Sequence, residues 1–120
     1  MRILYLSSQN LNNFIIKSAL TMKINIQSLK FTAKQELKDF VNEKVGKLSR
    51  FDDKIISADV TLELDTANKL DNKICDIRLI VPGYDDFVKK NAVTFEEAVS
   101  SAVETLQTVL QRKKAQAKSL

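Results

Sequence analysis

The sequence contains no histidine, no tryptophan and a single cysteine, Cys75. The absence of histidine excludes histidine metal sites, histidine general bases and Ser-His or Cys-His nucleophile pairs. One cysteine cannot form an internal disulfide, which favours a reducing compartment and predicts a cytoplasmic protein. There are only two glycines and no Gly-rich phosphate loop. Most enzyme chemistry is therefore excluded.

The remaining reactive side chains do not form a convincing site. Carboxylates occur as neighbours at 52–53, 85–86 and 96–97, and adjacent residues in a strand or helix point apart. The polar segment 65–72 lacks the glycine and the closing glutamate of a calcium loop, so we interpret it as a solvated hairpin loop. Cys75 lies in an apolar segment and is predicted to be a buried, inert thiol. We expect no enzymatic activity, metal, cofactor or small-molecule substrate.

The chain has 120 residues, of which 44% are apolar and 28% charged, and this composition is typical of one globular domain with a small core. The net charge of +4 is unevenly distributed. Residues 22–51 carry seven basic and three acidic side chains. Residues 52–86 carry four basic and nine acidic side chains, and residues 87–120 carry six basic and three acidic ones. The two basic ends of the sequence indicate a polyanionic partner. The alternative is that these charges serve only to keep the protein in solution.

Residues 1–21 differ from the rest of the chain because they contain no carboxylate and show no clean helical or strand period. Polar residues interrupt what would be the apolar region of a signal peptide, and no apolar run is long enough to span a bilayer. We expect residues 1–21 to be an extension, either a mis-assigned translation start or a mobile arm. Residues 22–120 are then the single domain.

Four strands are predicted, at 22–28, 56–65, 73–81 and 87–91. The first two alternate apolar and polar residues, as half-buried strands do. The third carries apolar residues on both sides and is expected in the centre of the sheet. Pro82-Gly83 is the strongest turn signal in the chain, and it separates the third strand from the fourth.

Two helices are predicted, each preceded by a capping box, at 32–35 and 94–97. The first continues to about residue 50, and the second holds helical spacing for about five turns. Their apolar stripes are Leu37, Phe40, Val41, Val45 and Leu48, and Phe95, Ala98, Val99, Ala102, Val103, Leu106, Val109 and Leu110. The order β-α-β-β-β-α predicts a two-layer α+β sandwich, with a four-stranded sheet and two helices on one face.

Basic residues on the two helices are the most informative surface feature. Helical geometry places Lys38 on one flank of the first helix and Lys44 and Lys47 on the other. Arg112, Lys113 and Lys114 gather near the end of the second helix, where cations also offset the helix dipole. This placement suits recognition of folded RNA by shape and phosphate contacts, because few aromatic or amide side chains are predicted on the helices.

Residues 22 to about 116 resemble the ribosome hibernation promoting factor and ribosome-associated inhibitor family, in its short form. The resemblance rests on MKINI at 22–26, LKDFV at 37–41, KVGKL at 44–48 and TFEEAV at 94–99. It continues through Leu106, Leu110, Arg112 and Lys114. It implies a fold similar to a double-stranded-RNA-binding domain.

The resemblance also implies a function in translation regulation and the stress response. Members of the family bind the small ribosomal subunit through its 16S rRNA, where they occupy the channel of the messenger and the A- and P-site transfer RNAs. Translation is thereby inhibited under starvation or in stationary phase, by competition with mRNA and tRNA. No membrane is involved.

The same resemblance implies candidate rRNA-binding residues, which are Lys38, Lys44, Lys47, Arg112 and Lys114. Thr105 and Thr108 stand where the family usually has basic residues, so the middle of the second helix is less cationic. Lys89 and Lys90 on the fourth strand are candidates to compensate, and Lys113 completes the set. The alternative function is a protein-interaction module, in which the acidic sheet binds a basic protein and the lysines only solubilise.

Overall fold

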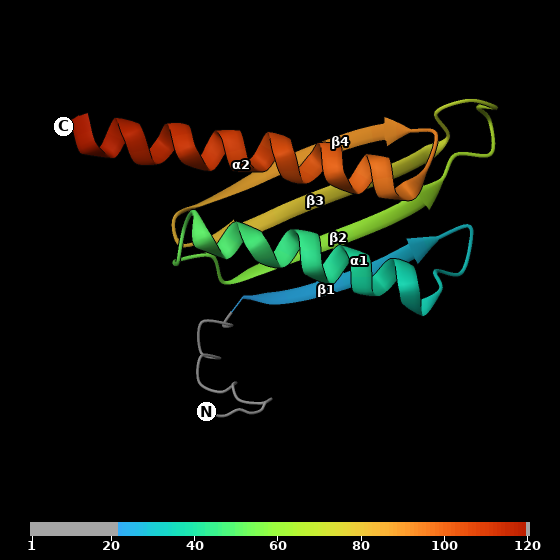
Figure 1. Ribbon diagram of the computed structural model, residues 1–120, viewed down its shortest axis with the longest axis horizontal. Coiled ribbons are helices and arrows are strands. Elements are labelled where there is room, and N and C mark those ends of the chain that lie inside the picture. The colour runs from blue at the N-terminus through green and yellow to red at the C-terminus, as the bar shows by residue number, and fades with distance from the viewer. Residues whose placement is uncertain (1–21, 120) are drawn as a thin grey trace, which may run out of the picture.

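The computed structural model describes the backbone of residues 22–119 and the side chains of residues 22–116 (Figure 1). The predicted extension at 1–21 lies outside the described residues. Four strands form one sheet in the order β1-β2-β3-β4. Their bounds are Lys23–Leu29 for β1, Ser57–Leu64 for β2, Lys73–Val81 for β3 and Tyr84–Ala92 for β4. All four predicted strands are confirmed, and β3 lies inside the sheet as expected.

The fourth strand is longer than the segment 87–91 predicted for it. It pairs with β3 along its whole length, from Val81 opposite Tyr84 to Lys73 opposite Ala92. The turn between them contains Gly83, whose φ of 92° lies in the left-handed region that glycine tolerates. Pairing with a neighbouring strand thus extends β4 into a segment whose own sequence alternates poorly.

Both helices cover the same face of the sheet, which confirms the two-layer α+β fold (Figure 1). The helices are α1 (Gln35–Gly46), continued by the 3₁₀ turn η2 (Lys47–Arg50), and α2 (Phe95–Ser119). Because β1 and β2 are parallel, the chain must cross over between them, and α1 makes this crossover. Neither helix, over residues 22–119, has the length and apolarity needed to cross a membrane.

The two predicted capping boxes have different outcomes. At α2 the Thr94 hydroxyl accepts a hydrogen bond from the Glu97 N–H at 3.1 Å, as predicted. At α1 the prediction is wrong, because the N-cap is Lys34 and no side chain caps the helix. The Gln35 amide, expected to reach back to Thr32, instead donates to Asp39 Oδ1 at 2.8 Å.

A contact between distant residues explains the later start of α1. Lys30 has a φ of 67° and turns the chain as it leaves β1. The Phe31 ring then stacks on Phe95, the first residue of α2, with ring centroids 4.4 Å apart. Packing between the two helix starts therefore fixes the chain through residues 31–34, and local capping does not.

The core lies between the helices and the sheet. The strands β1, β2 and β3 direct alternate apolar residues toward the helices, and β4 contributes Val88 and Ala92. The helices return their apolar stripes. Its largest fully buried side chains are Leu48, Leu62, Ile77, Leu79, Leu106, Leu110, Val41, Val45, Val60, Val99 and Cys75. Leu37 and Phe40 of the predicted stripe are only partly buried at its margin. Burial, with a further contribution from Asp76, raises the pKa of the Cys75 thiol to about 12, which fits the predicted inert thiol.

The other face of the sheet is open and carries charges of both signs. Its carboxylates are largely matched by neighbours: Asp59 accepts a hydrogen bond from Asn25 at 2.8 Å, and Arg78 forms an ion pair with Asp85 at 3.4 Å. The Arg78 guanidinium also lies 5.5 Å from the centre of the exposed Phe87 ring. The acidic middle of the sequence therefore becomes a mixed surface and not a continuous acidic one.

Asp76 is the exception on this face. Its Oδ1 is buried and has no hydrogen-bond partner among the described residues. Burial raises the pKa of the Asp76 carboxyl, opposed by Lys89 and reinforced by Glu63. A raised pKa in the folded state means that ionisation of Asp76 favours the unfolded chain.

We predict that Asp76→Asn raises the free energy of unfolding at pH 7. Because the folded-state pKa is the higher one, the destabilising contribution of Asp76 appears as the pH rises above about 3.9, the ordinary aspartate value. The gain should therefore shrink as the pH falls toward 3. Urea unfolding of both proteins across this pH range measures it. The matched control is Asp59→Asn, which removes the charge of a carboxylate that already accepts a hydrogen bond from Asn25 and should not stabilise. An Asp76→Asn gain that is independent of pH would contradict the assignment.

Candidate nucleic-acid interface

The two helices lie side by side and run in the same direction, so their C-terminal ends lie at the same end of the molecule (Figure 1). Both ends are basic, with Lys44 and Lys47 on α1 and η2, and Lys114 on α2. Cations at these positions are favourable because the carbonyl ends of both helix dipoles are negative. The fold thus gathers lysines that are about 70 residues apart in sequence.

A groove with a volume of about 270 Å³ separates the two helices. Its first wall is formed by Lys44, Lys47, Leu48 and Phe51. Its second wall, on α2, is formed by Ser100, Val103, Glu104 and Gln107. Leu48 is fully buried and Val103 is 9% exposed, so the groove has an apolar floor beneath a polar and charged rim.

The two lysines of the groove are only weakly held by the protein. Lys44 Nζ lies 5.5 Å from the centre of the Phe40 ring, which sits at the margin of the core. Lys47 Nζ lies 4.0 Å from Glu43 Oε2, and both side chains of this ion pair are largely exposed. An exposed pair of this length contributes little. Both cations therefore remain accessible to an external anion.

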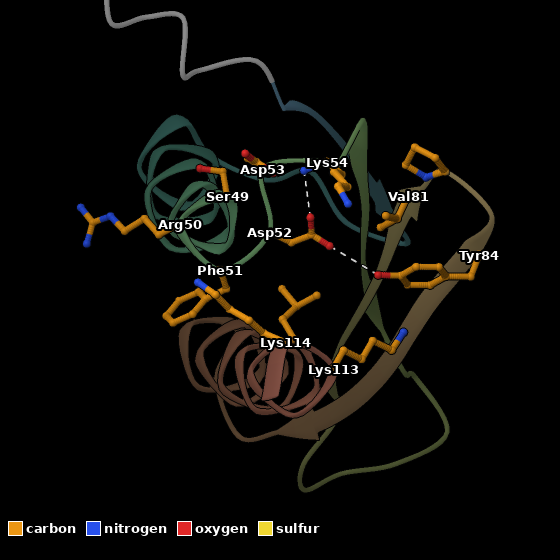
Figure 2. Close-up of a pocket in the computed structure, with 12 residues that line it drawn as sticks. Ser49, Arg50, Phe51, Asp52, Asp53, Lys54, Val81, Tyr84, Lys113 and Lys114 are labelled. Atoms are coloured by element: carbon orange, nitrogen blue, oxygen red, sulfur yellow. Dashed lines mark hydrogen bonds between the residues drawn. The ribbon is translucent and has the colours of Figure 1, made fainter. Parts of the chain in front are cut away.

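A second hollow, of about 570 Å³, opens at the basic end of the molecule (Figure 2). It lies between the segment 49–54, the β3–β4 turn and α2. Its charged lining residues are Arg50, Asp52, Asp53, Lys54, Lys113 and Lys114. Phe51 lines this hollow as well as the groove between the helices. Lys114 therefore borders a hollow that adjoins the groove of Lys44 and Lys47.

Lys113 is part of the fold at this end. Its Nζ lies 2.7 Å from Asp86 Oδ1 and 3.7 Å from the centre of the Tyr84 ring. The Asp86 side chain is only 11% exposed, so Lys113 neutralises a nearly buried carboxylate. The Tyr84 hydroxyl donates to Asp52 Oδ2 at 3.4 Å (Figure 2). Burial raises the pKa of this hydroxyl, with the charge of Lys113 opposing the rise.

The other predicted residues do not join the groove. Lys38 is six residues before Lys44 and lies on the opposite flank of α1, as predicted from helical geometry. Arg112 and Lys114 are two residues apart, which is about 200° around a helix, so they face different sides of α2. Of the candidate residues, the groove thus contains Lys44 and Lys47, and the end hollow contains Lys113 and Lys114.

Lys89 and Lys90, the candidates to compensate for the two threonines, lie on opposite faces of the sheet. Successive residues of a strand point to opposite faces of the sheet. Lys90 pairs with Cys75 and shares the helix side, whereas Lys89 pairs with Asp76 on the open face. A single RNA surface on the helices can therefore include Lys90 but not Lys89.

The sequence analysis missed four residues that the fold brings into the groove: Phe51, Ser100, Glu104 and Gln107. Glu104 and Gln107 are three residues apart, a spacing that places both on one flank of α2. That spacing was visible in the sequence, but the neighbour across the groove was not. Thr108, one of the two threonines that replace basic residues, donates its hydroxyl to the Glu104 carbonyl at 3.1 Å.

The described residues contain no group of three or more His, Cys, Asp or Glu side chains placed to hold a metal ion. The groove instead combines weakly held lysines on its rim with buried apolar side chains beneath it. Such a surface can neutralise phosphates and cover an apolar or aromatic group.

Comparison with known proteins agrees with this fold. A search of curated protein sequences finds no match. The chain is similar to the N-terminal domain of Protein Y from Thermus thermophilus, with 24% identity, 76% of this chain and 98% of that chain covered, and a TM-score of 0.65. It is also similar to a ribosomal subunit interface protein from Coxiella burnetii, with 21% identity, 78% and 99% coverage, and a TM-score of 0.69.

These two structures support the fold. The sequence model of one family matches residues 24–118, which is nearly the whole described chain. The chain therefore belongs to the sigma 54 modulation protein / S30EA ribosomal protein family.

Proposed function

We propose that the protein is a ribosome hibernation factor that binds the small ribosomal subunit through phosphates of its 16S rRNA. Seated in the channel of messenger RNA and of the A- and P-site transfer RNAs, it inhibits translation by occlusion under starvation. The observation that carries this proposal is the convergence of Lys44, Lys47 and Lys114 at the shared end of two parallel helices. Family membership supports the ribosome as the partner.

Electrostatics favours RNA as the ligand of this surface. Lysines with free ammonium groups release condensed counterions when they neutralise phosphates, which supplies much of the affinity of proteins for nucleic acids. The basic groove and end hollow adjoin through Phe51, so one RNA segment can contact both helices. Blocking the channel then requires no catalytic group, because the volume of the bound protein alone excludes messenger and transfer RNA.

The alternative, an acidic sheet that binds a basic protein, has less support. The open face carries Arg78 and Lys89 among its carboxylates. Arg78 is already paired with Asp85. A basic partner would therefore meet cations as well as anions, and like charges facing each other across an interface are unfavourable.

We predict that replacing Lys44, Lys47 and Lys114 together with glutamine weakens binding to isolated small ribosomal subunits and leaves the fold intact, because the three ammonium groups are not buried. Each lost phosphate contact should reduce the slope of log affinity against log salt by about 0.7 to 0.9. Cosedimentation over a range of salt concentrations, with and without messenger and transfer RNA, measures affinity and competition.

The matched control replaces Lys34, Lys69 and Lys73 with glutamine. These lysines lie at the N-terminal end of α1 and around the β2–β3 loop, so the variant has the same net charge but an intact basic end. Its affinity should stay close to that of the unmodified protein. Equal weakening by both triple variants would show that net charge, and not a localised surface, drives binding.

Lys113→Ala is predicted to act on stability and not on binding. Loss of the ammonium leaves Asp86 without its partner at 2.7 Å, and a nearly buried acceptor left unpaired costs about 1 to 3 kcal/mol. Lys114→Ala, its sequence neighbour, should show the reverse pattern. Thermal unfolding and cosedimentation of both variants separate the two roles, and a Lys113→Ala protein that is stable but fails to bind would refute this division.

A further inference from the structure

The groove between α1 and α2 has features that phosphate recognition does not need. Phe51 is partly exposed and lines the groove, above the buried side chains of Leu48 and Val103. A phosphate gains nothing from an aromatic ring, whereas a nucleobase presents a flat face that stacks on aromatic side chains. The ligand beside Phe51 is therefore expected to be a base, and the lysines on the rim suit its flanking phosphates.

The second feature is a carboxylate on a surface that is otherwise basic. Glu104 faces Lys44 and Lys47 across the groove, and its side chain forms no ion pair within the described part of the chain. A carboxylate at this point repels a phosphate backbone that lies across the groove. It can accept hydrogen bonds from the amino group of adenine, cytosine or guanine. Uracil offers only its N3–H, which lies between two carbonyl oxygens that repel a carboxylate.

Gln107 completes the polar rim one helical turn from Glu104. Its amide offers a donor and an acceptor together, which is the combination used to read base edges. The volume of about 270 Å³ lies just below the range of about 300 to 1,000 Å³ that is usual for drug-sized ligands. This space suits a single base and is too small for a paired stem.

From these observations we propose that the groove receives one unpaired, amino-bearing nucleobase of the RNA. Phe51 covers its face, Glu104 and Gln107 contact its edge, and Lys44 and Lys47 neutralise the adjoining phosphates. This rests on the proposed RNA-binding function and adds to it the class of nucleotide recognised. Duplex RNA alone would then be an incomplete ligand.

The test compares RNA hairpins that share one stem and differ at a single bulged nucleotide. Fluorescence anisotropy measures binding to hairpins with a bulged adenine, cytosine, guanine or uracil, and to the fully paired stem. The unmodified protein should bind at least one amino-bearing bulge about fivefold or more tighter than the uracil bulge, the lower end of what a well-paired base edge provides. Comparable affinity for all five RNAs would overturn the proposal, as would failure to bind any of them at low salt.

Two variants locate the effect. Glu104→Gln should reduce the preference over uracil, because glutamine can also donate to a uracil carbonyl, and Ser100→Trp should abolish bulge recognition by filling the groove from its exposed rim. The control is Glu96→Gln, an equal charge change in the first turn of α2, which should keep the preference. A preference unchanged in Glu104→Gln and Ser100→Trp would place recognition elsewhere and refute the groove.

Failure of the base-recognition proposal can be distinguished from failure of the proposed ribosome-binding function. If the unmodified protein cosediments with small subunits but does not distinguish the hairpins, the base proposal fails and the proposed function stands. If it does not cosediment with small subunits, the proposed function fails.

Discussion

The one-sided apolar face of the sheet is the constraint from which the remaining arrangement follows. Ile24 and Ile26 of β1 and Val88 of β4 point to the same side as the apolar residues of the two inner strands, so both helices must cover that side. Strand pairing gives β1 and β4 the same direction. Because α1 follows β1 and α2 follows β4, both helices run back across the sheet in the same direction. Their two basic C-terminal ends therefore lie at the same end of the molecule.

Local charge balance then decides which cations at this end are free. Lys113 and Lys114 are neighbours in sequence, yet one lies against Asp86 and Tyr84 and the other borders the surface hollow. The first compensates a nearly buried carboxylate, and the second keeps its charge for an external partner. A basic cluster in a sequence is therefore a mixture of structural and binding residues, and only the fold separates them.

Much of the fold could be predicted because its signals are local. Alternation located the first two strands and a run of apolar residues the third, and the bounds of β3 match the predicted segment 73–81. The Pro82-Gly83 turn located the fourth. The Thr94 cap located the start of α2. The cap at Thr32 failed because the stacking of Phe31 on Phe95 joins residues 64 positions apart, and no local pattern records such a contact.

The site was predicted less completely for the same reason. The flanks of α1 follow from helical geometry, so the separation of Lys38 from Lys44 and Lys47 could be foreseen. The groove could not, because it requires the distance and direction between two helices. Nothing in the sequence singles out Glu104, because the two lysines opposite it belong to another helix.

The central claim is that the helix face at the basic end contacts ribosomal RNA. A cryo-electron microscopy structure of the protein bound to the small ribosomal subunit tests it most directly. The account predicts rRNA phosphates beside Lys44, Lys47 and Lys114, with the open face of the sheet turned away from the RNA. A complex in which the open face binds a ribosomal protein, and the groove between α1 and α2 faces solvent, would contradict it.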